Sequence, residues 1–277
     1  MVRPSLEPTS EWSARNRFDA QAARFDRRAG VPPAAADQIA AAVLEGVGHP
    51  SADQVVLELG AGTGEVGRQL AGRVDRYVGV DLSAPMLDVF RAKLTDVPTR
   101  PQALLLQADG DKSWPVRRGS VAVVFASRVA HLLGAAHLVS EVARVCREDG
   151  RFLVGRIERS GVKQVLRRQR EAILADRGVA GVRSGGRRTQ ALLEAFVAAG
   201  AVAEPKRAVA TWTVTTTAEE IIAGWQTMPS MGGEAVTPEV RADVLSELRR
   251  WADGELGELD RPQESRETYT LEGVRLG

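Results

Sequence analysis

Residues 55–64, VVLELGAGTG, constrain the fold of this chain more than any other stretch. The apolar run that opens the stretch predicts a buried strand, and the clustered glycines predict a tight turn directly after it. Glycine lets a ligand lie against the main chain, because it carries no side chain. Residues 65–70 predict the start of a helix, whose free N–H groups point back at the turn. The stretch therefore predicts a strand–turn–helix unit with a nucleotide-sized binding site at the turn, formed by Gly60, Gly62 and Gly64.

Two kinds of cofactor fit this turn. Read from Gly62, the segment GTGEVG matches the dinucleotide pattern G-x-G-x-x-G, and an acid follows at a suitable distance, Asp81. Glu58 favours a different cofactor, because a carboxylate inside the strand is a poor neighbour for a pyrophosphate. The same carboxylate can bind an ammonium group, directly or through water. Both interpretations stay open on this stretch alone.

Strand and helix patterns alternate five times, which predicts an α/β fold with a parallel sheet. Ligands of such sheets bind beyond the carboxyl ends of the strands. Asp81, Asp109 and Ser127 follow the second, third and fourth predicted strands and therefore share this edge. Asp81 is placed to accept hydrogen bonds from a ribose diol, and Asp109 from an adenine amino group. The predicted strands cover residues 55–57, 77–80, 103–107, 121–126 and 151–157.

Some element boundaries depend on single residues. Gly150 predicts the end of a helix over 135–147, which makes Cys146 a buried residue of that helix. Pro205 predicts a break in the strand pattern of residues 201–214. Thr217 and Glu220 form a capping box that opens a further helix. The alternating segment 267–276 predicts a final antiparallel strand at or near the sheet edge.

Several segments carry a family resemblance. ELGAGTG (58–64) resembles motif I of the class I S-adenosylmethionine (SAM)-dependent methyltransferases, and DLSAPML (81–87) resembles the family's D-x-S-x-x-M-L segment. EVARVCREDGRFLVGRI (141–157) resembles E-x-x-R-V-L-K-P-G-G-x-L/F, with Glu148-Asp149-Gly150 where the family has Pro-Gly-Gly. FDAQAARFD (18–26) resembles the segment that folds over the cofactor in small-molecule methyltransferases; the alternative is a plain amphipathic helix.

The resemblance covers residues 18–157 well and the remainder only in outline. It implies a doubly wound, mostly parallel seven-stranded Rossmann-like sheet, with helices on both faces and a helical cap. It also implies SAM above the glycine turn. The residues implied for the cofactor are Glu58, Gly60, Ala61, Gly62, Gly64, Asp81, Leu82, Met86, Asp109, Gly110 and Ser127.

Methyl transfer from a sulfonium depends mainly on positioning, because the leaving group is neutral. A base is required only if the acceptor loses a proton as it attacks. His131, which follows the fourth strand, is the candidate base; the alternative is that it only lines the pocket. The candidate substrate residues are Trp12, Phe18 and Phe25 in an apolar wall, and Arg128 and Arg156 in the opposite wall.

We expect a single methyltransferase domain over residues 1–277. It comprises an N-terminal cap (1–33), a SAM-binding core (34–160) and substrate or lid helices with C-terminal strands (161–277). One cysteine excludes an internal disulfide, and no His, Cys or Asp cluster has metal-ligand spacing, so we expect no metal. The chain shows no signal peptide or membrane span, and its net charge of +1 gives no bias toward nucleic acid or membrane. We therefore expect a cytoplasmic protein without either partner.

Charge is unevenly distributed in the second half of the chain. Residues 156–188 carry ten Arg and Lys against three acids, and residues 234–272 carry eleven acids against five arginines. One interpretation is that these surfaces face each other, within the chain or across a homodimer, or are solvated. The other is an anion site for a substrate carboxylate or phosphate beside the cleft. RNA fits less well, since the basic stretch has no interleaved aromatic residues.

Three functions are compatible with these observations. The leading hypothesis is SAM-dependent methyl transfer to an O, N or C atom of a small molecule. The second is an NAD-dependent oxidoreductase, because the dinucleotide pattern also fits. The third is a catalytically silent SAM-fold protein that acts as a partner of another protein. The sequence does not name the acceptor.

Overall fold

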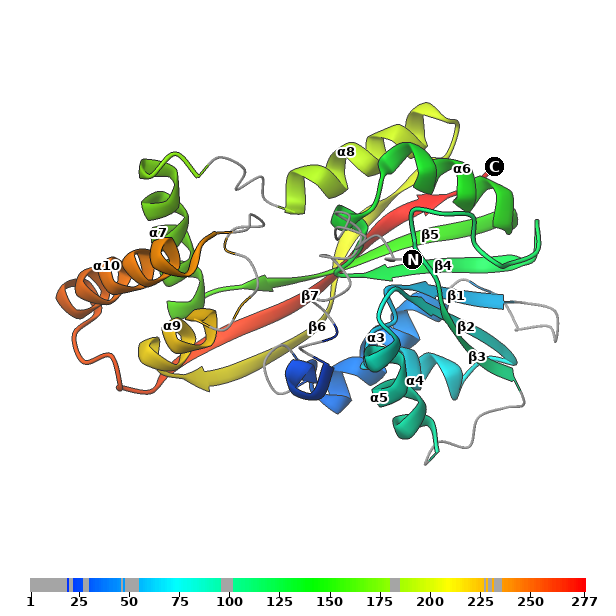
Figure 1. The fold of residues 1–277 in the computed structure, drawn as a ribbon. Coiled ribbons are helices and arrows are strands. Elements are labelled where there is room, and N and C mark those ends of the chain that lie inside the picture. Colours follow the sequence, from blue (N-terminus) through cyan, green and yellow to red (C-terminus); the bar gives the residue numbers. More distant parts are fainter. Residues whose placement is uncertain are drawn as a thin grey trace, which may run out of the picture. The chain divides into compact units, whose positions relative to one another are not determined.

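The computed structural model describes residues 19, 22–26, 30–45, 47, 55–95, 102–179, 185–226, 228, 231 and 236–277. Trp12 and Phe18, two of the predicted substrate residues, lie outside these ranges. In the described part, seven strands form one sheet in the order β3-β2-β1-β4-β5-β7-β6 (Figure 1). The strands are β1 (Val55–Leu59), β2 (Arg76–Asp81), β3 (Gln102–Gln107), β4 (Val121–Ser127), β5 (Cys146–Arg159), β6 (Val202–Thr216) and β7 (Gln263–Arg275).

The strands β1 to β5 pair in parallel, each with its neighbours in the sheet. All of β1 and nearly all of β4 are buried, which is typical of central strands covered on both faces. Helices α3, α4 and α5 lie along one face of these strands and α6 along the other (Figure 1). The structure thus confirms the predicted doubly wound, mostly parallel sheet. The helices are η1 (Ala22–Arg24), α3 (Pro33–Leu44), α4 (Gly67–Ala71), α5 (Ala84–Leu94), η2 (Ala130–Leu132), α6 (Ala135–Val145), α7 (Val162–Asp176), α8 (Gly185–Ala198), α9 (Ala218–Gln226) and α10 (Pro238–Leu256).

The last strand, β7, runs antiparallel to β5. The Leu276 N–H donates to the Gly150 carbonyl (2.8 Å) and the Ser160 N–H to the Arg266 carbonyl (2.9 Å), so residue numbers rise on one strand as they fall on the other. The predicted final antiparallel strand is therefore confirmed, one position in from the edge. The predicted break at Pro205 is wrong, because β6 continues through it. β6 lies at the edge of the sheet, where a residue without an N–H is tolerated.

The junction between α6 and β5 lies earlier than the sequence suggests. The helix ends at Val145, and Cys146, predicted as a helical residue, is the first residue of β5. Cys146 has an extended backbone and pairs with Val121 of β4, so the sheet ladder replaces the last helical turn. Its predicted burial is confirmed, at 6% exposure. Asp149 has a φ of +61°, a conformation that favours glycine, at the place where the methyltransferase resemblance has Pro-Gly-Gly.

The chain divides into two compact units. The first comprises residues 1–155, 195–205 and 272–277, and the second comprises 156–194 and 206–271. The second unit has its own apolar core, in which α7, α9 and α10 pack through residues such as Leu166, Ile222 and Leu248. Within the described residues, no helix is both long enough and apolar enough to cross a membrane.

Candidate functional site

The three glycines of the turn after β1 have different reasons to be glycine. All three have positive φ values, between +53° and +75°. A Cβ on Gly60 would lie 2.7 Å from the Val129 side chain, and one on Gly64 would lie 2.0 Å from the Phe90 ring. At Gly62 the nearest atom to such a Cβ is the Gly60 carbonyl oxygen, at 3.8 Å. Gly62 is thus the position of the turn that faces open space.

Asp81, at the end of β2, holds this turn in place. Its Oδ2 accepts a hydrogen bond from the Gly62 N–H (2.8 Å), and its Oδ1 accepts one from the Ser83 N–H (2.9 Å). Burial raises the pKa of Asp81, while these backbone donors oppose the rise. The neighbouring Ala61 is buried and donates its N–H to the Val80 carbonyl (3.0 Å). The structure therefore joins two of the predicted cofactor elements, the glycine turn and Asp81, through one carboxylate.

Glu58 lies in the core below the turn. It is 2% exposed, and its Oε2 accepts a hydrogen bond from the Tyr77 hydroxyl (2.5 Å) on β2. A Cβ on Gly67 would lie 2.5 Å from the same Oε2, so the carboxyl group packs directly beneath α4. Burial raises the pKa of Glu58 to about 8. The side chain that favoured an ammonium-bearing cofactor is therefore a buried acid with a tyrosine partner.

Asp109 and Gly110 begin the loop that follows β3. Asp109 is half-buried, and its Oδ1 accepts a hydrogen bond from the Asp111 N–H (2.9 Å). The Gly110 carbonyl accepts a hydrogen bond from the indole N–H of Trp114 (3.0 Å). Trp114 is 2% exposed, so it anchors this loop in the core.

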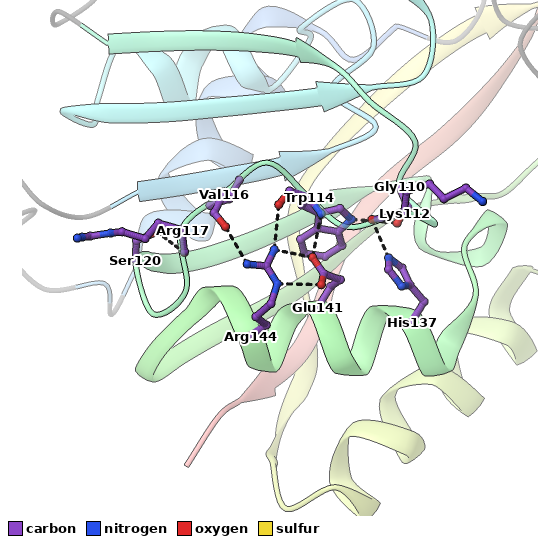
Figure 2. A network of polar contacts seen from close by, with 9 residues as sticks. All are labelled: Gly110, Lys112, Trp114, Val116, Arg117, Ser120, His137, Glu141 and Arg144. Atoms are coloured by element: carbon purple, nitrogen blue, oxygen red, sulfur yellow. Dashed lines mark hydrogen bonds and ion pairs between the residues drawn. The ribbon is translucent and has the colours of Figure 1, made fainter.

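A polar network fixes the same loop on α6 (Figure 2). Glu141 accepts a hydrogen bond from the Trp114 N–H (2.9 Å) and pairs with Arg144 (2.7 Å). Arg144 also donates to the carbonyls of Trp114 and Val116, each at 2.9 Å. Hydrogen bonds from Arg144 lower the pKa of Glu141. The sequence analysis did not predict that Glu141 and Arg144 hold this loop, although both residues belong to the E-x-x-R segment of the family resemblance.

The end of β4 carries the predicted residues Ser127, Arg128 and His131. Ser127 ends the strand and is half-buried, and His131 is half-buried in η2. Arg128 has a φ of +59° and forms an ion pair with Glu65. Its guanidinium carbon lies 5.4 Å from the centre of the Phe25 ring. Arg128, predicted to contact the substrate, is therefore engaged by an acid and by another predicted substrate residue.

The N-terminal segment contacts the turn region. Asp26 accepts a hydrogen bond from the Thr63 hydroxyl (2.5 Å) and pairs with Lys93. Lys93 in turn donates to the Thr63 carbonyl (2.8 Å). Asp19 accepts a hydrogen bond from the Ser83 hydroxyl (2.5 Å), next to Asp81. These contacts bring the described part of the predicted cap against the same edge of the sheet.

The remaining predicted residues are not all at this edge. Met86 is 2% exposed and is a core residue of α5, whereas Leu82 is half-buried beside Asp81. Arg156 belongs to the second unit, where its guanidinium lies 2.8 Å from the position of a Cβ on Gly186. Among the described residues no cluster of His, Cys, Asp or Glu is arranged to hold a metal ion.

The two oppositely charged stretches meet inside the second unit. Lys163 and Arg159 pair with Glu267 at 2.7 and 3.3 Å, and Arg177 pairs with Glu247 at 2.5 Å. These contacts support the interpretation in which the basic and acidic surfaces face each other within the chain.

Known proteins match the chain over this region. Residues 56–150 match the model of a methyltransferase domain family. An uncharacterized methyltransferase from Mycobacterium bovis is 38% identical over 103 residues, which span 37% of this chain and 40% of that relative. The chain therefore matches less than two thirds of the length of this curated relative.

Two solved structures share the whole fold. One, a proposed methyltransferase from Bacillus halodurans, is 18% identical with a TM-score of 0.54, over 88% of this chain and 98% of that one. The other, the cyclase SpnF, is 16% identical with a TM-score of 0.59, over 98% of this chain and 97% of that one. The methyltransferase resemblance is thus confirmed for residues 56–150, which match a methyltransferase domain, and the chain shares the fold of these two structures.

Proposed function

We propose that this chain transfers a methyl group from SAM to a small-molecule acceptor. The observation that supports this proposal best is the carboxylate of Asp81, which is hydrogen-bonded to the open glycine of the turn at 2.8 Å. A carboxylate suited to a ribose diol thus lies beside a main-chain segment that has no side chain at Gly62, within the region matched by the methyltransferase family model.

The residues at this edge fit the chemical parts of SAM. A cofactor can lie against Gly62, because no atom of the described residues occupies the space of a side chain there. Each Asp81 oxygen accepts one backbone hydrogen bond and keeps a lone pair for a ribose hydroxyl. Asp109, in the loop that follows β3, serves the adenine. Glu58 holds a proton at neutral pH in the free protein and lies below the methionine ammonium, whose positive charge would favour the ionised carboxylate. The remaining predicted contacts are Gly60, Ala61, Gly64, Leu82, Met86, Gly110 and Ser127.

SAM supplies a methyl group on a sulfonium with a neutral leaving group. The work left to the chain is to orient the acceptor and exclude water. Phe25 supplies an apolar surface, and the N-terminal cap closes over the bound cofactor. His131 is the base for an acceptor that must lose a proton. The near-zero net charge and the single cysteine support a cytoplasmic enzyme that acts on a small molecule, as a monomer or a homodimer.

Calorimetry with S-adenosylhomocysteine tests the cofactor site. Asp81→Ala should weaken binding by about 1.5–3 kcal/mol, the range for hydrogen bonds to a charged group. Circular dichroism of both proteins controls for loss of the fold. Unchanged affinity in a folded Asp81→Ala protein would remove Asp81 from the site. Protection from heat by NAD and not by S-adenosylhomocysteine would favour the oxidoreductase instead.

The similarity to SpnF favours one second candidate. That structure is named a cyclase and aligns over 98% of this chain, so this fold also hosts a reaction other than methyl transfer. The second candidate is a SAM-binding protein without methyl transfer. Mass spectrometry of acceptor candidates incubated with the protein and SAM separates the two: binding of the cofactor with no methylated product supports the second.

A further inference from the structure

Arg170 occupies a core position of α7. Val162, Leu166, Ile173 and Leu174 form the buried stripe of this helix, and Arg170 falls on the same stripe, four residues after Leu166. Its exposed fraction is 7%, compared with 47% for the side chain of Arg167 one turn away. Arginine is rarely buried to this extent unless a carboxylate pairs with it.

The guanidinium of Arg170 has an aromatic neighbour and forms no ion pair with a described residue, although Glu171 is the next residue of α7. Its central carbon lies 4.2 Å from the centre of the Trp225 ring on α9. Its Nε is fully enclosed and has no hydrogen-bond partner, and the two Nη atoms, the ends of the fork, are not enclosed in this way. Burial lowers the pKa of Arg170 to about 10, so the group keeps its charge at neutral pH.

Three acids on the surrounding helices pair with other cations. Glu171, the next residue of α7, pairs with Arg167 at 2.9 Å. Glu219 of α9 pairs with Arg249 at 2.7 Å, and Glu247 of α10 pairs with Arg177. Within the described residues, no ion pair includes Arg170, although the unit around it is rich in acids.

A second arginine lies near the same end of α9. Arg241 of α10 donates to the Gln226 carbonyl (3.2 Å), one residue beyond Trp225, and its own Nε is enclosed without a partner. Positive charge at the C-terminal end of a helix interacts favourably with the helix dipole. This gives a purely structural explanation of the two arginines, which the experiment must separate from a binding role.

Burial of a charge without a counter-ion disfavours folding, and an apolar side chain of similar volume is often more stable at such a site. The aromatic face of Trp225 offsets only part of this cost. A guanidinium fork matches the geometry of an oxyanion and binds it through two parallel hydrogen bonds. We propose that Arg170, with Arg241 beside the same helix end, binds the carboxylate or phosphate group of a small molecule within the second unit.

This site is separate from the cofactor site at the glycine turn, and its test needs no SAM. Thermal unfolding of the full chain is measured against inorganic phosphate, pyrophosphate and acetate, with chloride at equal ionic strength as the reference. We expect a saturable rise in Tm with one class of anion. A response to phosphate or pyrophosphate identifies a phosphate ligand, and a response to acetate identifies a carboxylate ligand.

Three variants separate binding from structure. Arg170→Met should weaken the anion response at least about tenfold, yet unfold without anion at the same temperature as the wild type or higher. Arg170→Lys keeps the charge but loses the forked guanidinium, so its anion response should lie between those of the wild type and Arg170→Met. Arg167→Met, which removes an exposed arginine from the same helix, should bind the anion as the wild type does.

Two results would overturn the proposal. The first is that none of the test anions raises the Tm of the wild-type protein more than chloride does. The second is an Arg170→Met or Arg170→Lys protein with lower stability and an unchanged anion response, which would make Arg170 a structural residue only.

Discussion

Gly62→Val tests whether the cofactor lies on the open glycine of the turn. Among the described residues, the new Cβ meets no atom closer than 3.8 Å, so the substitution creates no clash with them. Its cost in stability is conformational, because Gly62 has a φ of +53°, where a non-glycine residue costs about 1–2 kcal/mol and a branched one more. By contrast, Gly60 and Gly64 abut Val129 and Phe90, so substitution there would disrupt packing.

Gly119→Val is the matched control. Gly119 has a φ of +65°, and a Cβ there meets nothing within 4 Å, so valine carries the same conformational cost. Gly119 follows the Trp114 loop and lies in an exposed turn, away from the predicted cofactor contacts. The two variants should therefore lose similar free energies of unfolding, measured in urea.

Their affinities for S-adenosylhomocysteine should differ. Valine adds three carbon atoms to the space that faces the ligand, and a ligand in contact with Gly62 must move by at least a bond length, about 1.5 Å. Such a shift breaks the hydrogen bonds to Asp81, so we expect a loss of at least about 100-fold, or about 2.7 kcal/mol, in calorimetry. Gly119→Val should bind within about twofold of the wild type. Tight binding by Gly62→Val, or an equal loss in both variants, would refute the reasoning.

Three further predictions concern the surroundings of the site. The pKa of Glu58 rises from 4.5 to about 8 on folding, so between these pH values the folded protein holds a proton that the unfolded chain releases. The free energy of unfolding, measured in urea, should therefore fall as pH rises through this range, and Glu58→Gln should flatten that dependence. Glu141→Ala removes the acceptor of the Trp114 N–H and the ion-pair partner of Arg144, so it should lower the free energy of unfolding by about 1–3 kcal/mol, while Glu148→Ala, at an exposed position of β5, should not. Removal of residues 1–28 should abolish turnover and reduce SAM binding less, as measured by mass spectrometry and calorimetry; full turnover by the truncated protein would contradict the role of the cap.

The sequence predicted the parallel core because burial on both faces leaves continuous apolar runs, as in β1 and β4. It predicted the open turn because only glycine suits that geometry. It could not predict the partner of Glu58, because Tyr77 lies 19 residues away and reaches it only through the pairing of β1 with β2. The predicted boundary between α6 and β5 was wrong for the same reason. Cys146 belongs to the strand because it pairs with Val121 of β4, and no local sequence pattern indicates that pairing.

In the second unit, local sequence signals predicted the helices well, but they did not predict which charged side chains form ion pairs and which are buried. The capping box opens α9 as expected, since Thr217 and Glu220 exchange side-chain and backbone hydrogen bonds at 3.0 Å. The basic stretch, counted as one surface, contains both arginines paired with acids, such as Arg167 and Arg177, and a buried arginine, Arg170. The net charge does not distinguish these positions, whereas helical spacing does. Arg170 lies on the same face of α7 as Leu166 and Ile173 and is buried with them. Helical spacing, and not the net charge of the stretch, is therefore the sequence signal that separates Arg170 from the exposed arginines around it.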